Sequence, residues 1–116
     1  MSNEAMQKRL NYAKKTAEKS LQKIGYKTEC TSNKIYCIDA YRFSEHRIIA
    51  IGVKEIINCL WFKSQIRRLE KLPNPAPHVT SKETWIKEPE EHNFRLYYYR
   101  NETWLDEELN PTDIFN

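Results

Sequence analysis

Two ionisable residues, Asp39 and Lys54, lie near the ends of two apolar, β-rich runs at residues 35–41 and 47–54. The polar segment 43–46 separates the runs, so they are predicted to form a β-hairpin. Each charged residue lies near the strand end that is away from the turn, so we expect the carboxylate and the ammonium group to meet at one spot. A carboxylate can hold Mg²⁺ beside a phosphate, and a lysine can orient water or neutralise charge. The pair therefore predicts phosphodiester chemistry.

Side chains of a strand alternate between its two faces. Ile48, Ala50, Gly52 and Lys54 should therefore share one face of the second strand. The alternative interpretation of Asp39 and Lys54 is an ion pair within the sheet of an unrelated α+β domain. Charged residues are disfavoured in strands that face a core, so this alternative also asks for an explanation.

The spacing of Asp39 and Lys54 resembles that of the PD-(D/E)xK nuclease superfamily, and especially its small archaeal and viral Holliday-junction-resolvase-type members. In that family an Asp on the second strand is followed, about a dozen residues later, by an acidic-x-Lys triplet on the third strand. The acidic position of the triplet falls on Gly52. The resemblance covers about residues 8–100, and it implies a nuclease fold whose active site is either altered or inactive.

The resemblance also implies roles for two helical residues. A first-helix Glu or Gln often points at the metal site in this family, and Glu18 lies at such a place. A Gln at the start of the second helix faces the site in several branches, which makes Gln65 a candidate contact. The implied catalytic set is Asp39, Lys54, Glu18 and Gln65, with Asp39 and Glu18 as ligands of Mg²⁺ or Mn²⁺.

Ordinary roles remain open for both helical residues. Glu18 is also suitably placed to be an exposed acid or a partner of Lys14, and surface glutamines are common on helices.

An active enzyme would need another oxygen to replace the one missing at Gly52. The candidates for that oxygen are Glu18, Glu29, Glu45 and Glu55.

Apolar periodicity predicts the remaining elements. The expected fold class is α/β, an α+β mixed sheet with a restriction-endonuclease-like core in the order helix-strand-strand-strand-helix-strand-strand. The helices are expected at residues 5–24 and 63–72, with Gly25 ending the first and Pro73 stopping the second. The further strands are expected at residues 26–31, 83–87 and 93–100, and a proline-rich connector at residues 73–77.

The charge of the chain is unevenly distributed. Residues 1–24 carry six basic and two acidic side chains, residues 25–87 carry eleven and six, and residues 88–116 carry two and eight. A basic body with an acidic tail suits a polyanion binder, although ordinary solubilising charge gives the same pattern. The candidate nucleic-acid contacts on the two helices are Lys14, Lys15, Lys63, Arg67 and Arg68.

Length and composition set further bounds. The 116 residues suit a single nuclease-like domain, 1–116, with an acidic tail at about 101–116 that packs on the domain or on a second copy as a homodimer. No apolar run approaches the ~20 residues of a membrane span, and no signal peptide is recognisable. We therefore expect an intracellular protein, in the host cytoplasm if it is viral. The three cysteines match no zinc pattern and are expected to be reduced.

Two functional hypotheses follow. The first is a metal-dependent endonuclease that cleaves phosphodiesters in DNA, branched DNA included. The second is a catalytically degenerate protein of the same fold that acts as a DNA-binding or oligomeric interaction protein. In the second hypothesis Gly52 marks a disused site. A third possibility, an interaction module that touches no nucleic acid, stays open because the basic excess is modest.

Overall fold

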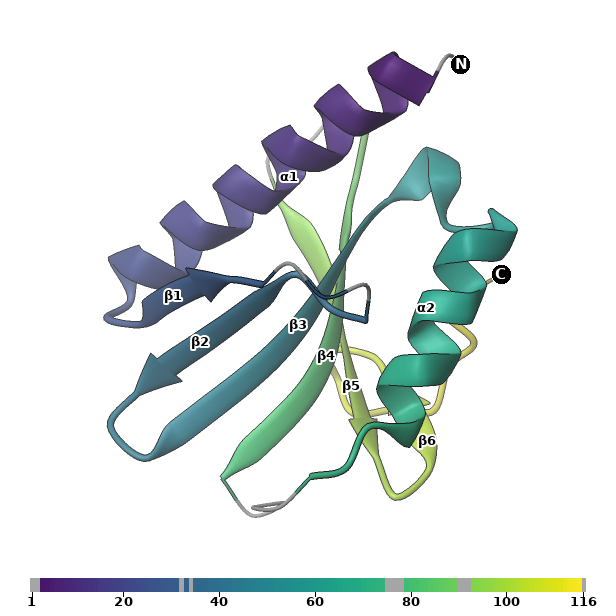
Figure 1. The fold of residues 1–116 in the computed structure, drawn as a ribbon. Helices are drawn as coiled ribbons and strands as arrows, with labels where there is room; N and C mark the ends of the chain where they lie inside the picture. Colours follow the sequence, from purple (N-terminus) through teal and green to yellow (C-terminus); the bar gives the residue numbers. More distant parts are fainter. Residues whose placement is uncertain (1–2, 32, 34, 75–78, 90–92, 116) are drawn as a thin grey trace.

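The computed structural model describes residues 3–31, 33, 35–74, 79–89 and 93–115. Figure 1 shows a mixed sheet flanked by helices in the predicted chain order. The elements are α1 (Asn3–Lys23), β1 (Lys27–Cys30), β2 (Ile38–Arg42), β3 (Glu45–Val53), a short 3-10 helix (Lys54–Ile56), α2 (Leu60–Lys71), β4 (Thr80–Lys87), β5 (Phe94–Arg100) and β6 (Thr103–Leu105).

The sheet runs in the order β1-β2-β3-β4-β5-β6. Its neighbouring strands pair antiparallel except β3 and β4, which are parallel because α2 carries the chain back between them. This arrangement confirms the predicted fold class and element order. Strand β6 was not predicted, since it lies within the segment that the sequence marks as an acidic tail.

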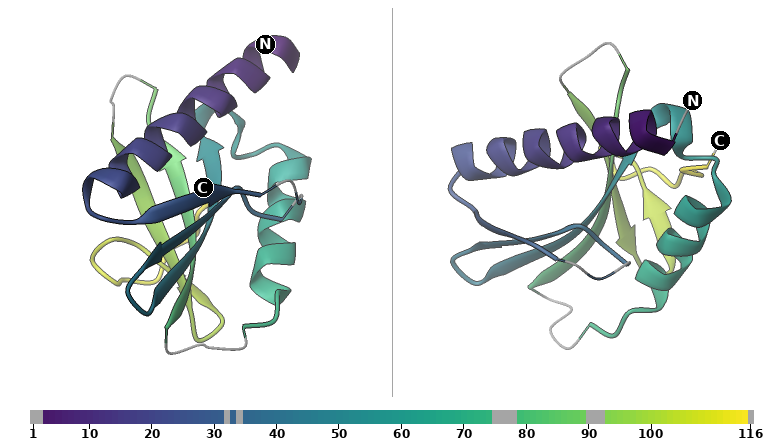
Figure 2. Two further views of the ribbon diagram at one scale, coloured as in Figure 1. Left: turned by 60° about the vertical axis from the view of Figure 1, so that its left-hand side comes forward. Right: turned by 45° about the horizontal axis from the view of Figure 1, so that its top comes forward.

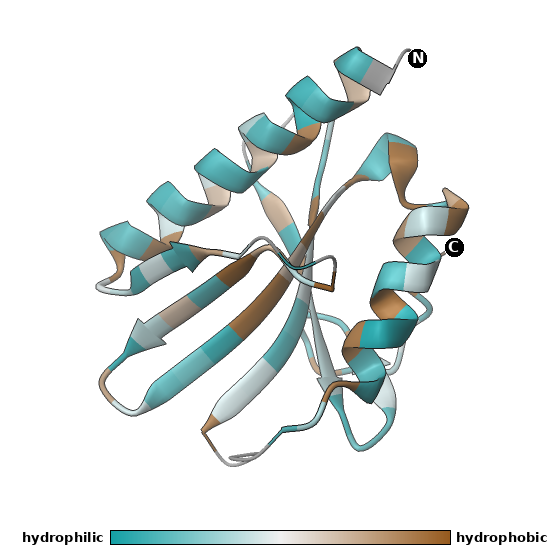
Figure 3. Cartoon of the chain, viewed as in Figure 1, coloured by the Kyte–Doolittle hydropathy of each residue, from teal (hydrophilic) through white to brown (hydrophobic). Residues whose placement is uncertain are grey.

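The two helices cover opposite faces of the sheet, as the two views in Figure 2 show. Ala13, Ala17 and Leu21 of α1 are fully buried against one face, and Phe62, Ile66 and Leu69 of α2 are fully buried against the other. Strand β3 lies between the two cores, and its apolar centre is the brown band in Figure 3. The alternation predicted for β3 is confirmed, since its odd-numbered apolar residues pack with α1 and its even-numbered ones with α2.

Helix α1 ends as its sequence predicts. Gly25 has a φ of +96°, a left-handed conformation that costs a glycine little. The amide of Tyr26 donates to the carbonyl of Leu21 across this turn. The chain therefore reverses sharply, and β1 starts beneath the C-terminal end of α1.

The β2–β3 hairpin forms as predicted, but it turns over two residues, Phe43 and Ser44. Arg42 lies opposite Glu45, and Asp39 lies opposite Ile48. Strand β3 is longer than β2, so the end of β3 extends well past the start of β2. This register decides which predicted site residues can meet.

The C-terminal segment packs on the domain. Trp104 and Ile114 are buried in the core beneath α2, and Phe115 lies beside the side chains of Lys63 and Arg67. Among the described residues, no helix is both long enough and apolar enough to cross a membrane.

Candidate functional site

Asp39 lies on the face of the sheet that α2 covers. Its chain neighbours Ile38 and Ala40 point into the core under α1, and side chains alternate along a strand, so Asp39 points the other way. The Tyr36 hydroxyl donates to one carboxylate oxygen over 3.1 Å, and the His46 ring nitrogen lies 2.8 Å from the other. Burial raises the pKa of the Tyr36 hydroxyl, and the Asp39 carboxylate raises it further. Both oxygens of Asp39 therefore already have partners, one on β3 and one in the segment before β2.

Glu18 faces the other side of the sheet. It accepts hydrogen bonds from the Thr28 hydroxyl at 3.3 Å and the Cys30 thiol at 2.9 Å. Thr28 pairs with Ala40, which points into the core under α1, so Glu18 is held on the α1 side. The sheet separates Glu18 from Asp39, and the expectation that they share one metal ion is contradicted by this geometry.

Lys54 is remote from Asp39. It lies six residues beyond Ile48, the cross-strand neighbour of Asp39, which corresponds to about 20 Å along a strand. Its ammonium group instead pairs with the Glu88 carboxylate at 3.2 Å. The prediction that Asp39 and Lys54 meet was wrong. It assumed that the two strands end at the same level, but β3 extends beyond the start of β2.

Gly52, the residue that the resemblance aligns with the family's acidic position, is buried on the α2 side. A β-carbon at this position would lie 2.7 Å from the Phe62 ring and 3.0 Å from the end of Ile86. The space that a carboxylate would need is therefore filled by the core. Substitution by an acidic residue would require Phe62 to move.

Of the other acids proposed to replace the missing ligand, two have partners elsewhere and one lies beside Asp39. Glu45 accepts from Tyr26 and Arg42, and Glu55 pairs with Arg9. Glu29 is the cross-strand neighbour of Asp39 and is exposed. In the described part of the chain no three His, Cys, Asp or Glu side chains form a group suited to a metal ion. The structure therefore does not bring together Asp39 and Glu18, the ligands of Mg²⁺ or Mn²⁺ that the resemblance implies.

Gln65 does lie at a pocket. This hollow of about 490 Å³, here called the inter-helix pocket, opens where the N-terminal half of α1 approaches α2 beside the segment before β2. Gln65 and Arg68 reach it from α2, and Lys14 reaches it from α1. The side-chain oxygen of Gln65 is buried without a hydrogen-bond partner among the described residues. The remaining lining residues are Gln7, Leu10, Thr31, Asn33, Tyr36, Cys37, Ile51, Trp61 and Ser64.

The inter-helix pocket is cationic. Among the residues that the structure describes, no Asp or Glu lines it, while Lys14 and Arg68 both do. Within the described residues neither cation forms an ion pair with a carboxylate. Burial raises the pKa of the Cys37 thiol in this pocket, and the positive charge of Lys14 opposes that rise. The arrangement can bind an anion, since its positive charge has no counter-charge in the pocket.

The other predicted nucleic-acid contacts have different surroundings. Arg67 pairs with Glu70 at 2.7 Å and lies over the Phe115 ring, which Lys63 also approaches. Lys15 is exposed on α1 and does not line the pocket. Of the predicted basic contacts, the structure therefore brings together Lys14 and Arg68.

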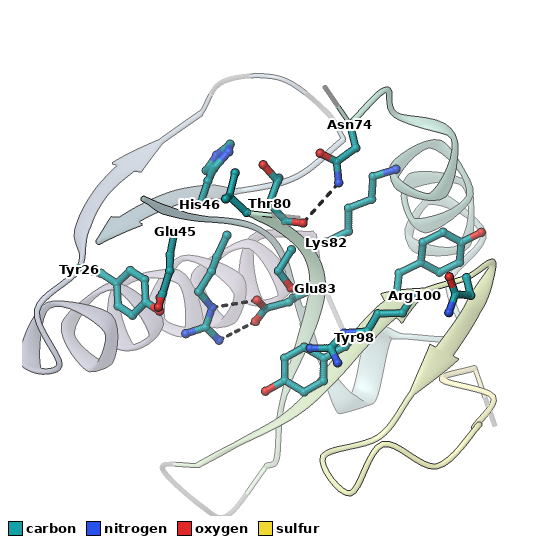
Figure 4. A pocket seen from close by; sticks show the side chains of 14 residues that line it. Tyr26, Glu45, His46, Asn74, Thr80, Lys82, Glu83, Tyr98 and Arg100 are labelled. Atoms are coloured by element: carbon teal, nitrogen blue, oxygen red, sulfur yellow. Dashed lines mark hydrogen bonds and ion pairs between the residues drawn. The ribbon is translucent and has the colours of Figure 1, made fainter. Parts of the chain in front are cut away.

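A larger hollow of about 700 Å³ lies at the other end of the strands, where β3, β4 and β5 meet (Figure 4). Its floor holds an ion pair in which Arg47 donates two hydrogen bonds to Glu83, at 2.6 and 2.8 Å. The Trp85 indole also donates to Glu83, which is 1% exposed. Burial alone would lower the pKa of Arg47, but Glu83 raises it above its usual range.

The charges at the floor of this larger hollow are thus mutually satisfied. Lys82 donates to backbone carbonyls of Glu70 and Leu72, and burial lowers its pKa. Arg47 also lies over the rings of Tyr26 and Trp85. These contacts indicate a structural network, because each buried charge has its partners within the fold.

Sequence reasoning did not find the inter-helix pocket as a unit. Tyr36 and Cys37 come from the irregular segment before β2, and Trp61 from an apolar run whose secondary structure the pattern leaves ambiguous. A polar Gln65-Arg68 pair at helical spacing was the available signal. It could not be joined to Lys14 because the angle between the helices is not encoded in either pattern.

Comparison with known proteins gives a likeness at the level of fold. The solved structure of a Holliday junction resolvase from the archaeal hyperthermophile Archaeoglobus fulgidus matches with a TM-score of 0.50, covering 88% of this chain and 92% of that chain at 11% sequence identity. No family model matches the sequence, and neither does any curated protein. The match confirms the restriction-endonuclease-like fold predicted above.

Proposed function

We propose that this protein binds DNA through the inter-helix pocket and its rim and does not cleave it. The observation that carries the proposal is a pocket with two cations, Lys14 and Arg68, and no carboxylate. A site of this charge attracts phosphate and lacks the oxygen ligands that Mg²⁺ prefers.

Binding follows from the charge of the surrounding surface. Helix α1 carries six basic side chains against two acidic ones, and Arg68 extends the positive charge onto α2. Lysine and arginine that contact phosphates release condensed counterions, so the affinity should fall steeply with salt. The acidic C-terminal segment packs beneath α2 through Trp104 and Ile114, which are not among the residues that line the pocket.

The absence of cleavage is inferred from the placement of the carboxylates. Asp39 and Glu18 lie on opposite sides of the sheet, and Gly52 is packed against Phe62. Metal-assisted hydrolysis needs an ion held near the scissile phosphate and a water beside it. Asp39, Glu18 and Gly52 are not placed to supply the ligands of such an ion together.

Branched DNA is the first substrate to test, because the protein with the similar structure is a Holliday junction resolvase. The experiment mixes the purified protein with labelled four-way junction, duplex and single-stranded DNA, with Mg²⁺ or Mn²⁺ added. Retardation and cleavage are followed on the same gel. The variants are Asp39→Ala and the double charge reversal Lys14→Glu with Arg68→Glu.

The matched control is the double charge reversal Lys19→Glu with Lys23→Glu, an equal change in net charge at two exposed positions of α1 outside the pocket. We expect retardation without cleavage for the wild type, Asp39→Ala and the control. The double variant should lose most of its affinity, and its salt slope should fall by about 1 for each phosphate contact removed.

Two results would count against the proposal. Metal-dependent cuts in the wild type that disappear in Asp39→Ala would indicate an active nuclease with Asp39 as a ligand. Equal loss of retardation in the double variant and in the control would mean that general charge is responsible and that the pocket is not the contact.

A further inference from the structure

We propose that the inter-helix pocket accepts one unpaired nucleotide of the bound DNA strand, with its base against Trp61 and its phosphate between Lys14 and Arg68. This inference rests on the proposed function and adds the chemical group that enters the pocket. The juxtaposition behind it is an aromatic ring, an amide acceptor and two cations around one hollow, the acceptor and the cations having no polar or ion-pair partner among the described residues.

The size of the pocket suits a nucleotide. Its volume is about 490 Å³, which lies in the range of small-molecule sites, about 300–1,000 Å³. A stretch of paired duplex is too wide to enter a hollow of this size, whereas one base turned out of the stack is not. The pocket therefore selects for DNA that has a base available.

Trp61 provides a surface for stacking. Its ring packs edge-on against Phe62 at a centroid distance of 5.9 Å, which fixes it from one side, while 44% of the residue stays exposed. A large apolar ring left exposed at a pocket wall costs solvation free energy, and a base would cover it. Stacking of a base on an aromatic side chain strengthens binding by about five-fold to a hundred-fold.

Gln65 provides a hydrogen-bond acceptor. Its side-chain oxygen has no partner among the described residues, and buried polar atoms are nearly always satisfied. The terminal torsion of a glutamine is soft, so a small rotation presents this amide to the pocket. An N–H group at the edge of a base would supply the missing donor.

The phosphate lies with the cations in this arrangement. Lys14 comes from α1 and Arg68 from α2, so an anion between them would link the two helices across the mouth of the pocket. Asn33 lines the same hollow and carries a second amide. The pocket thus offers a contact for the base and a contact for the phosphate, and neither contact needs a carboxylate or a metal ion.

The test compares three duplexes of one sequence: fully paired, with one unpaired adenine, and with an abasic unit in place of that adenine. Affinities are measured by fluorescence anisotropy for the wild type, Trp61→Ala and Gln65→Leu. Tyr12→Ala is the control, since Tyr12 is an exposed aromatic residue of α1 outside the pocket. Thermal melting confirms that each variant is folded.

We expect the wild type and Tyr12→Ala to favour the unpaired adenine over the abasic unit by about five-fold to a hundred-fold. Trp61→Ala should reduce that ratio to about one while affinity for the paired duplex is retained, and Gln65→Leu should reduce it in part. Free deoxyadenosine monophosphate should bind at least about ten-fold more weakly than the bulged duplex, since it lacks the flanking phosphates.

Each contrary result has its own meaning. Binding to all three duplexes with equal affinity would overturn the inference and leave the proposed function intact, whereas no binding to any of them would overturn both. An unchanged preference in Trp61→Ala would also overturn the inference. Free nucleotide bound as tightly as the bulged duplex would contradict the requirement for a DNA strand.

Discussion

The ring of Phe62 lies so close to the α-carbon of Gly52 that a β-carbon there would come within 2.7 Å of it. The ring is fully buried, and Ile86 closes the same space from the neighbouring strand. The glycine is thus required by core packing between β3 and α2. An acidic side chain at position 52, which the sequence resemblance would call for, has no room in this core.

Substitution of Gly52 should destabilise the fold and should not create a nuclease. Gly52→Ala is expected to lower the free energy of unfolding by about 1–3 kcal/mol, because overpacking forces the Phe62 ring to shift. Gly52→Asp should cost more, since it also buries a charge without a partner. Urea unfolding followed by circular dichroism measures both values.

Ala50→Ser is a useful companion, because position 50 faces the same core one strand period earlier. It shows the cost of a small polar group in this core. Metal-dependent DNA cleavage that is gained by a stably folded Gly52→Asp would contradict the packing account.

The hydrogen bond from the Cys30 thiol to Glu18 should suppress the reactivity of that cysteine. The bond and the nearby charge raise the pKa of Cys30 to about 11, and burial adds to the effect. Glu18→Gln removes the negative charge, which lowers the pKa and increases the thiolate fraction. At pH 8.5 iodoacetamide should alkylate Cys30 about ten-fold or more faster in the variant.

Peptide mass spectrometry reads the rate at Cys30 separately from that at Cys59, which serves as the internal control in both proteins. The rate at Cys59 should be unchanged, since Glu18 contacts β1 and not this residue. An unchanged rate at Cys30 would show that Glu18 does not face β1. It would contradict the conclusion that the sheet separates Glu18 from Asp39.

The buried pair of Arg47 and Glu83 should matter more for stability than the exposed pairs. Glu83→Ala leaves the guanidinium of Arg47 buried without a partner, which is expected to cost about 3–5 kcal/mol of unfolding free energy. Glu88→Ala is the matched control, because its partners Lys54 and Arg95 are largely exposed and its loss should cost about 0–1 kcal/mol.

Both variants are measured by urea unfolding at one pH. A small effect of Glu83→Ala, similar to that of Glu88→Ala, would mean that Arg47 finds water in the hollow of Figure 4. The hollow would then be a hydrated surface and not the closed charge network described above.

Much of the fold was predictable because each element carries its own local signal. The apolar stripe of α1, the glycine at position 25 and the proline after α2 define where the helices run. The alternation in β3 likewise assigned its two faces correctly. Strand β6 was missed because three residues among acids and turns carry too weak a pattern.

The site was harder to predict because it depends on register and on helix placement. The sequence separation of Asp39 and Lys54 predicts that they meet, but the two-residue turn places Asp39 opposite Ile48, six residues before Lys54. Lys54 pairs with Glu88 instead. Glu18 has a suitable place on α1, yet strand alternation sends Asp39 to the other face. Neither fact can be obtained from spacing alone.

The central claim is that DNA is held at the carboxylate-free pocket between the helices and is not cut. The most direct measurement is the gel that follows retardation and cleavage of labelled four-way junction DNA with Mg²⁺ or Mn²⁺. It compares the wild type with Lys14→Glu/Arg68→Glu and with the control Lys19→Glu/Lys23→Glu. The account predicts intact, retarded DNA for the wild type and the control, and free DNA for the double variant. Cleaved junctions, or retardation that persists in the double variant, would contradict it.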